Sequence, residues 1–374
     1  MIRIRTLFAL LLCIYLIGFG AHAAMLGKTV YGDGIFYYSW VRSTVVDNDI
    51  DFTNDYTEFG VTQPITPSGL PGNKYSIGAS ILWYPWFAWT HTLVRGSGYE
   101  PIYQYVTGLS SVLYALVGLI LLYRTLRRQF SEPIAIITIL ATALCTHLLF
   151  YGSIDAVNSH AASFFATSLF VTLLMQRERR WFQIGCAIGL VALVRTQDIV
   201  VGLAILPFIK PKHIAAVVAG GLYVFMPQLL VWQILNNAFW KSPYISSIEG
   251  FNFLSPHIAG VLFSTGNGLF LWTPVLLLGI AGLWMYRQTK PNIYFLLAIA
   301  IQIFVVSSWS IWWQGASYSG RMFVGTIPLF AFGMAGMFKL LAIKHIEYKD
   351  QLLSVIIPLA FINMLLILYF LISH

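Results

Sequence analysis

The sequence predicts an all-α integral membrane protein with about eleven transmembrane helices and a long first external loop. Hydrophobic residues make up 58% of its 374 residues and charged residues only 10%, whereas a soluble domain has roughly 25% charged residues. Apolar runs long enough to cross a ~30 Å hydrocarbon core, about 20 residues each, recur from one end of the chain to the other. The basic residues gather in short clusters between these runs, as in the loops of a multi-pass membrane protein.

The first apolar run, from Thr6 to about Leu26, has two interpretations. Arg3 and Arg5 precede it, and the Ala-His-Ala at positions 21–23 resembles the cleavage site of a secretory signal. The run is longer than an ordinary signal core, so we favour a retained membrane helix with a cytoplasmic N-terminus. Both interpretations place the next segment outside the cytoplasm.

Residues 27–101 then form the long external loop. Its apolar and aromatic stretch 77–94 is interrupted by Pro85, which favours a helix lying in the membrane interface over one that crosses the bilayer. Further spans are expected at 102–123, 133–150, 159–175, 181–194, 199–209, 213–235, 268–286, 291–308, 322–340 and 351–372. We therefore interpret residues 1–374 as one polytopic membrane domain, and expect no soluble C-terminal domain.

The charged residues predict the orientation of these spans. Alternate loops carry 15 of the 22 lysines and arginines, and by the positive-inside rule those loops are cytoplasmic. Ten of the 14 acidic residues fall on the opposite side, so polar chemistry is expected there. The +8 net charge is unaccompanied by a nucleic-acid-binding signature, and we expect no nucleic-acid partner. The cysteines all lie within apolar runs, which argues against disulfides: Cys13, Cys145 and Cys186.

Two external carboxylates are candidates for the catalytic role. Asp33 stands between two glycines and beside aromatic residues just after the first span; partial desolvation there suits a general base. The alternative is a solvated turn aspartate. Asp155 lies in the next short external loop, where it is either a second catalytic carboxylate or the N-cap of a helix.

The candidate substrate-binding residues are mainly external cations. Arg195 lies between two short apolar runs, and Arg321 ends an aromatic, Gly- and Ser-rich loop. A guanidinium at membrane depth needs an anionic partner, and its planar fork matches a phosphate. Lys74 is a third such cation unless it extends to the interface. The remaining members of the predicted binding set are His160, Tyr38 and Gln314.

Metal binding is a weaker hypothesis. Oxygen-bearing side chains occupy the ligand positions of an EF-hand loop over residues 47–58, but Phe52 stands where the loop requires glycine. A solvated acidic loop is the preferred interpretation. No cofactor is required by the sequence, although a divalent cation held by Asp47, Asp49 and Asp51 stays possible.

These features favour chemistry on a lipid-linked substrate. Nucleotide sugars and ATP are cytoplasmic, and the sequence carries no phosphate-binding P-loop or dinucleotide fingerprint. An external transferase would therefore use a donor delivered by the membrane, such as a polyprenyl-phosphate sugar. A multi-pass transporter or flippase component of an envelope pathway is the alternative, although its site would be expected near the midplane.

The sequence also resembles the polyprenyl-phosphate-sugar-dependent glycosyltransferases of the type C fold, relatives of protein O-mannosyltransferases and aminoarabinose transferases. The resemblance rests on the order and sidedness of several segments: 32–34, 42–51, 74–78, Asp155, 195–198 and 312–321. It implies an inverting displacement in which Asp33 is the base and Lys74 contacts the donor phosphate, although Tyr75 and Ser76 stand where the family has prolines. The expected partners are a lipid, glycan or protein acceptor and membrane lipids, with the choice of acceptor left open. The short loops and compact chain suggest a bacterial inner membrane.

Overall fold

The computed structural model describes residues 4–241, 249–344 and 348–373, and the regular secondary structure within these ranges is helical, apart from two isolated β-bridges. Arg3 lies outside the described residues. The α-helices are α1 (Ile4–Leu26), α2 (Asp33–Arg42), α3 (Thr53–Glu58), α4 (Gly78–Val94), α5 (Pro101–Leu126), α6 (Glu132–Leu144), α7 (Ser159–Leu174), α8 (Trp181–Val194), α9 (Pro211–Asn236), α10 (Ile258–Phe263), α11 (Leu269–Trp272), α12 (Val275–Met285), α13 (Asn292–Ser308), α14 (Ile327–Lys344) and α15 (Tyr348–Ser373). Two π-helices, η1 (Ser43–Asp47) and η2 (Phe150–Ile154), and two 3-10 helices, η3 (Thr196–Ile205) and η4 (Arg321–Thr326), complete the set.

Hydropathy and length identify the helices that suit a membrane. Five segments of the described chain are long and apolar enough to cross one: Ile4–Leu26, Pro101–Leu126, Pro211–Asn236, Arg321–Ala342 and Ser354–Ser373. Six shorter apolar helices accompany them: Glu132–Leu144, Ser159–Leu174, Trp181–Val194, Thr196–Ile205, Val275–Met285 and Asn292–Ser308. The all-α multi-pass class is confirmed, while the total of about eleven crossings stays a prediction.

Three expected spans differ from the structure in form. Residues 196–205 form the 3-10 helix η3, which at ~2.0 Å per residue extends only about 20 Å and is too short to cross the hydrocarbon core. The run 268–286 is divided into α11 and α12, and Pro274 is the N-cap of the second helix. The run 133–150 ends as α6 at Leu144. Apolar composition alone does not distinguish these short or broken helices from continuous spans.

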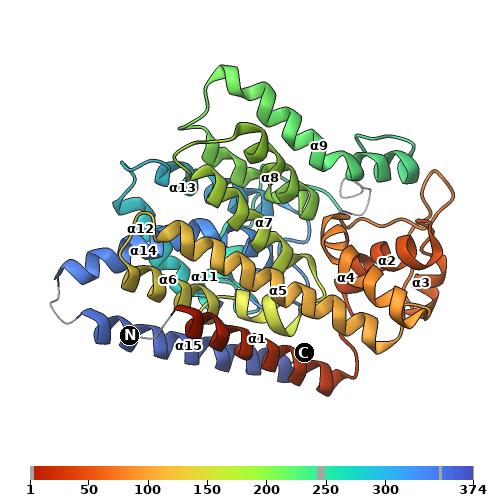
Figure 1. Cartoon of the computed structure of the whole chain (residues 1–374), viewed down its shortest axis with the longest axis horizontal. Coiled ribbons are helices and arrows are strands. Elements are labelled where there is room, and N and C mark those ends of the chain that lie inside the picture. The colour runs from red at the N-terminus through yellow and green to blue at the C-terminus, as the bar shows by residue number, and fades with distance from the viewer. Residues whose placement is uncertain (1–3, 242–248, 345–347, 374) are drawn as a thin grey trace.

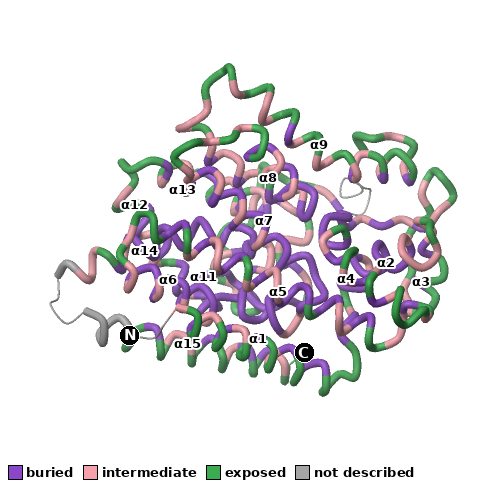
Figure 2. The backbone as a smooth tube through the Cα atoms, in the orientation of Figure 1, coloured by how far each residue is buried: buried purple, intermediate pink, exposed green. Residues whose placement is uncertain are grey.

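Helices pack closely at the centre of the molecule. Figure 2 shows the buried residues concentrated around α5, α7 and α11, and exposed residues along the outer faces of α1, α9 and α15. At the contact between α12 and α14, a Cβ on Gly282 would overlap the carbonyl oxygen of Gly333. Small residues at such contacts let helix backbones approach, which is how helices associate within a bilayer.

The N-terminal helix is part of this packed core. Leu11 and Tyr15 of α1 are each only 1% exposed, and the Tyr15 hydroxyl donates to the Ala143 carbonyl at 2.9 Å. Phe19 lies against Gly108 of α5. These contacts favour the retained helix over a cleaved signal.

Residues 27–101, which the sequence predicts to be the first external loop, contain α2, α3 and α4, which gather at one end of the molecule, on the right in Figure 1. The helix expected at 77–94 is present as α4, with Pro85 inside it. Trp83 and Phe87 on one face are fully buried, whereas Trp89 and Leu93 are 63% and 70% exposed. An exposed aromatic and apolar face is what a helix in the membrane interface needs.

Candidate functional site

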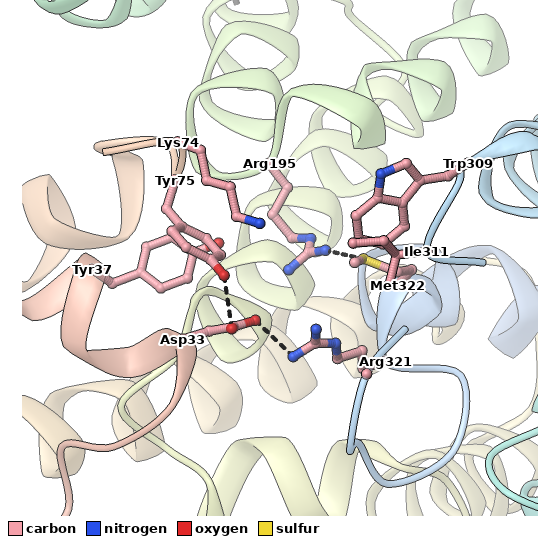
Figure 3. Close-up of a pocket in the computed structure, with 10 residues that line it drawn as sticks. Asp33, Tyr37, Lys74, Tyr75, Arg195, Trp309, Ile311, Arg321 and Met322 are labelled. Atoms are coloured by element: carbon pink, nitrogen blue, oxygen red, sulfur yellow. Dashed lines mark hydrogen bonds and ion pairs between the residues drawn. The ribbon is translucent and has the colours of Figure 1, made fainter. Parts of the chain in front are cut away.

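A cavity of about 200 Å³ lies where residues 33–75 meet the end of α8, the segment between α13 and η4, and the start of η4. Figure 3 shows Asp33, Lys74, Arg195 and Arg321 extending toward this shared space. These four residues come from distant parts of the chain, and the structure brings them together as lining residues. The full lining is Asp33, Tyr37, Lys74, Tyr75, Arg195, Trp309, Ile311, Gly315, Arg321 and Met322.

Asp33 is the first residue of α2. Its preceding residue, Gly32, has φ 52°, a left-handed conformation that glycine adopts without the Cβ penalty. The helix N-terminus favours a negative charge at this position. Both carboxylate oxygens have donors: the Tyr75 hydroxyl to Oδ1 and Arg321 Nη1 to Oδ2, each at 2.7 Å. With its side chain 27% exposed, Asp33 is held in place and still accessible from the cavity.

Asp155 lies just after η2, close enough to Asp33 for the two charges to interact. Burial and the charge of Asp33 raise the pKa of Asp155 to about 7, although Arg321 opposes the shift. The Asn158 amide donates to Asp155 Oδ2 at 3.4 Å, and Asn158, not Asp155, caps α7. The N-cap interpretation of Asp155 is therefore wrong. Asp155 is instead a second carboxyl group near Asp33, although it is not among the residues that line the cavity, and burial favours its protonated form.

Arg195 stands at the junction of α8 and η3 and is 7% exposed. Its Nη1 donates to Ser159 Oγ at 2.9 Å, and Ser159 Oγ donates in turn to the Tyr37 hydroxyl at 2.9 Å. On its other side, Nε lies 3.7 Å from Asp198 Oδ2. Asp198 is itself fully buried and accepts from Ser163 Oγ at 2.5 Å and Gln302 Nε2 at 3.2 Å. The guanidinium is thus charge-paired within the protein, with one edge facing the cavity.

Lys74 lies near the rim of the cavity and forms an ion pair with Glu249. The segment after Glu249 is bound to the cavity wall: Ser310 N donates to Gly250 O at 2.9 Å, and Asn252 N to Ser308 O at 2.6 Å. These bonds hold the Glu249 segment beside Trp309, which lines the cavity.

The other predicted binding residues have supporting positions. Gln314, with φ 61°, accepts from Met322 N at 3.0 Å and so shapes the loop that ends at Arg321. His160, 1% exposed, lies 3.2 Å from Arg195 Nη1 through its Nδ1. Tyr38 is fully buried and donates to the Gly98 carbonyl. Tyr37 rather than Tyr38 lines the cavity, so the structure corrects the choice of tyrosine.

The cavity also contains residues that the sequence analysis did not select. Tyr37 follows Asp33 by four residues, the spacing that puts two side chains on one helix face, and this signal could have identified it. Tyr75 adjoins Lys74 and Met322 adjoins Arg321. Trp309 and Glu249 had no comparable signal, because only the tertiary fold brings them to the site.

Hydrogen bonds and an ion pair within the protein hold the acidic segment 47–58. Asp49 Oδ1 accepts from Ser43 Oγ at 2.6 Å, and Asp51 Oδ1 from the Thr53 backbone nitrogen at 3.0 Å. Asp47 pairs with Arg42. Among the described residues, no group of three or more His, Cys, Asp or Glu side chains is arranged to hold a metal ion, and the divalent-cation hypothesis stays a prediction.

Asp55, in the same segment, differs most from expectation. It was placed in a solvated loop, but its side chain is 0% exposed and lies 3.6 Å from Arg42 Nη1. Burial raises the pKa of Asp55 to about 7, with Arg42 opposing the shift. The acidic composition of the segment indicates a solvated loop, and it gives no sign of the buried Arg42–Asp55 pair.

Comparisons with known proteins agree with this architecture. Residues 82–232 match the model of the dolichyl-phosphate-mannose-protein mannosyltransferase family. The structure is similar to crystal structures of ArnT from Cupriavidus metallidurans in the apo state (14% identity, TM-score 0.57, covering 90% of this chain and 59% of that one) and bound to undecaprenyl phosphate (14%, 0.58, 94% and 63%). It is also similar to the Archaeoglobus fulgidus oligosaccharyltransferase in complex with zinc and sulfate (12%, 0.55, 96% and 52%).

The chain spans about half to two thirds of the length of these structures. No curated protein matches the sequence. At 12–14% identity, the likeness concerns the fold, and it confirms the type C membrane glycosyltransferase fold.

Proposed function

We propose that this chain, which has the type C membrane glycosyltransferase fold, transfers a sugar from a polyprenyl-phosphate carrier to an acceptor on the external face of the membrane. The observation that carries the proposal is the convergence of Asp33 with Lys74, Arg195 and Arg321 in one cavity. A base and several phosphate-binding cations are what such a reaction requires. The sugar is a hexose or a pentose, and the acceptor is a lipid, a glycan or a protein.

The reaction is an inverting single displacement. The acceptor oxygen forms a bond to the anomeric carbon while the bond from that carbon to the phosphate oxygen breaks, and the electron pair leaves with the phosphate. Asp33 takes the acceptor proton; a general base of this kind contributes about 10²–10⁴-fold to the rate. The cations of the cavity stabilise the charge on the leaving phosphate, and this stabilisation is strongest where water is excluded.

Asp155 has an auxiliary role in this mechanism. Burial raises the pKa of Asp155 to about 7 and so favours its protonated form, which can donate a hydrogen bond that an ionised Asp33 cannot. We assign to it the orientation of the acceptor hydroxyl beside Asp33.

The setting is a multi-pass membrane protein of the bacterial inner membrane with a cytoplasmic N-terminus and an external site. Single cysteines at the exposed positions Glu58 and Asn252 should react with an impermeant thiol reagent added to intact cells. A cysteine at Glu178, also exposed, should react only after lysis. Labelling of position 178 alone in intact cells would reverse the orientation.

The test separates transfer from transport. Purified protein is reconstituted in liposomes with a series of radiolabelled polyprenyl-phosphate sugars and membrane extract as acceptor, and label leaving the carrier is measured. We expect label to move to an acceptor with release of polyprenyl phosphate. Label that stays on the carrier while the lipid or a solute crosses the bilayer would instead support the flippase or transporter interpretation.

A further inference from the structure

We propose that Arg321 changes partner during the reaction: it pairs with Asp33 while that carboxylate is ionised, and it is released to the leaving phosphate when Asp33 takes the acceptor proton. This inference rests on the proposed function and assigns Arg321 a catalytic role distinct from those of the other two cations. It begins from how the charges of the cavity are paired.

Each lining cation has its own carboxylate in the described structure. Arg321 pairs with Asp33 at 2.7 Å, Lys74 with Glu249, and Arg195 with Asp198 at 3.7 Å. The site before the reaction is therefore close to electrically balanced. A phosphate that gains charge needs a cation whose own partner loses charge at the same moment.

Of these three carboxylates, only Asp33 changes its charge in the proposed displacement. Glu249 and Asp198 take no part in it, and Asp198 is further held by Ser163 and Gln302. Arg195 consequently stays paired through the reaction. Arg321 is the cation whose ion pair is broken by the reaction, because the reaction protonates Asp33.

The hydrogen-bond inventory supports the exchange. A neutral carboxyl group holds a guanidinium less tightly than a carboxylate does, because protonation removes the Coulomb attraction between the two opposite charges. The guanidinium has donors only, whereas the Tyr75 hydroxyl on Oδ1 can turn and accept. Tyr75 can therefore accept the new O–H of protonated Asp33, whereas Arg321 keeps at most a hydrogen bond to a neutral oxygen and loses its ionic partner.

The change of partner by Arg321 follows the movement of charge in the reaction. One proton moves from the acceptor hydroxyl to Asp33, which becomes neutral, and one electron pair moves from the broken glycosidic bond to the phosphate, which becomes more negative. Arg321 Nη1 is already at the Asp33 carboxylate, and its side chain is 15% exposed toward the cavity. A small reorientation is enough to move its donors from Asp33 to the phosphate.

A double-mutant cycle on product binding tests this exchange without measuring transfer. The dissociation constant of undecaprenyl phosphate is measured at pH 8 for the wild type, Asp33→Asn, Arg321→Met and the double variant. Asp33→Asn imitates the protonated base and frees Arg321, so we expect about tenfold tighter binding. In the Arg321→Met protein, adding Asp33→Asn should change the dissociation constant by less than about twofold. Coupling energies of this kind isolate a pairwise term.

The matched control is the same cycle with Arg195→Met, where the gain from Asp33→Asn should persist in full because Arg195 keeps its own partner. Arg321→Gln replaces Arg321→Met if the latter does not fold, as judged by its melting curve. If Asp33→Asn tightened undecaprenyl phosphate binding equally with Arg321 present and with Arg321→Met, the effect would be only the loss of repulsion from the Asp33 charge. That result would overturn the exchange. A wild-type protein that binds no undecaprenyl phosphate would overturn the proposed function itself.

Discussion

Gly34→Ala is a perturbation that separates the geometry of the site from its chemistry. Gly34 follows Asp33 in α2, and a Cβ there would overlap the Val157 carbonyl oxygen, well inside the 3.0 Å that real Cβ atoms respect. Val157 belongs to the loop that begins with Asp155. The substitution therefore pushes apart the two segments that carry the candidate catalytic carboxyl groups, without altering either group.

The expected size of the effect follows from that overlap. Ordinary van der Waals contact begins at 3.4 Å, so restoring it requires a backbone displacement on the order of 1 Å, and a misplacement of that size costs about 10²-fold in rate. Overpacking of this kind also destabilises by about 1–3 kcal/mol. The fold should survive.

The assay compares kcat for sugar transfer from the lipid carrier with the melting temperature of the same preparation. Gly20→Ala in α1 is the matched control, because a Cβ there meets nothing within 4 Å. We expect the control to behave as wild type. A Gly34→Ala protein with unchanged kcat would refute the view that the spacing of these two segments positions the base.

Three further perturbations test separate parts of the site. Asp33→Asn should lower the transfer rate by about 10²–10⁴-fold with donor binding retained, whereas the same change at Asp47 should leave the rate near wild type; equal losses would remove the base assignment. Arg195→Ala should weaken use of the donor by tens- to thousands-fold, the equivalent of about 2–5 kcal/mol for a desolvated charged partner, while Arg127→Ala should not; similar behaviour would make Arg195 structural. Burial raises the pKa of Asp55 to about 7, so the folded state binds this proton more readily than the unfolded state, and Asp55 makes the protein more stable as pH falls from about 7 toward 4. Asp55→Asn should remove this contribution, so its melting temperature should rise less than that of the wild type over the same pH range. A pH profile identical to that of the wild type would contradict this.

Much of the site could be predicted because charge is rare in this sequence. With 10% charged residues, a basic residue at the end of an apolar run is conspicuous, and Arg195 and Arg321 were identified on that ground. Asp33 was identified by its place after the first span. No pairwise pattern in the sequence predicts that these residues meet; the fold brings them together where α2, the end of α8 and the start of η4 converge.

What the sequence could not predict depended on helix phase and on distant contacts. The four-residue spacing from Asp33 indicates Tyr37 over Tyr38 only once residues 33–42 are known to be helical, and the sequence analysis did not predict a helix there. Asp55 appeared solvated because its neighbours are acidic, and its burial depends on Arg42 of another helix. Glu249 reaches Lys74 from a segment about 175 residues away, beyond the reach of local pattern.

The convergence of a base and cations on a lipid phosphate can be observed directly in an electron cryo-microscopy structure of the protein with bound undecaprenyl phosphate. We expect the phosphate within the cavity, in hydrogen-bond contact with at least two of Lys74, Arg195 and Arg321 and next to Asp33. A phosphate bound elsewhere on the protein, with this cavity unchanged, would contradict the proposed site.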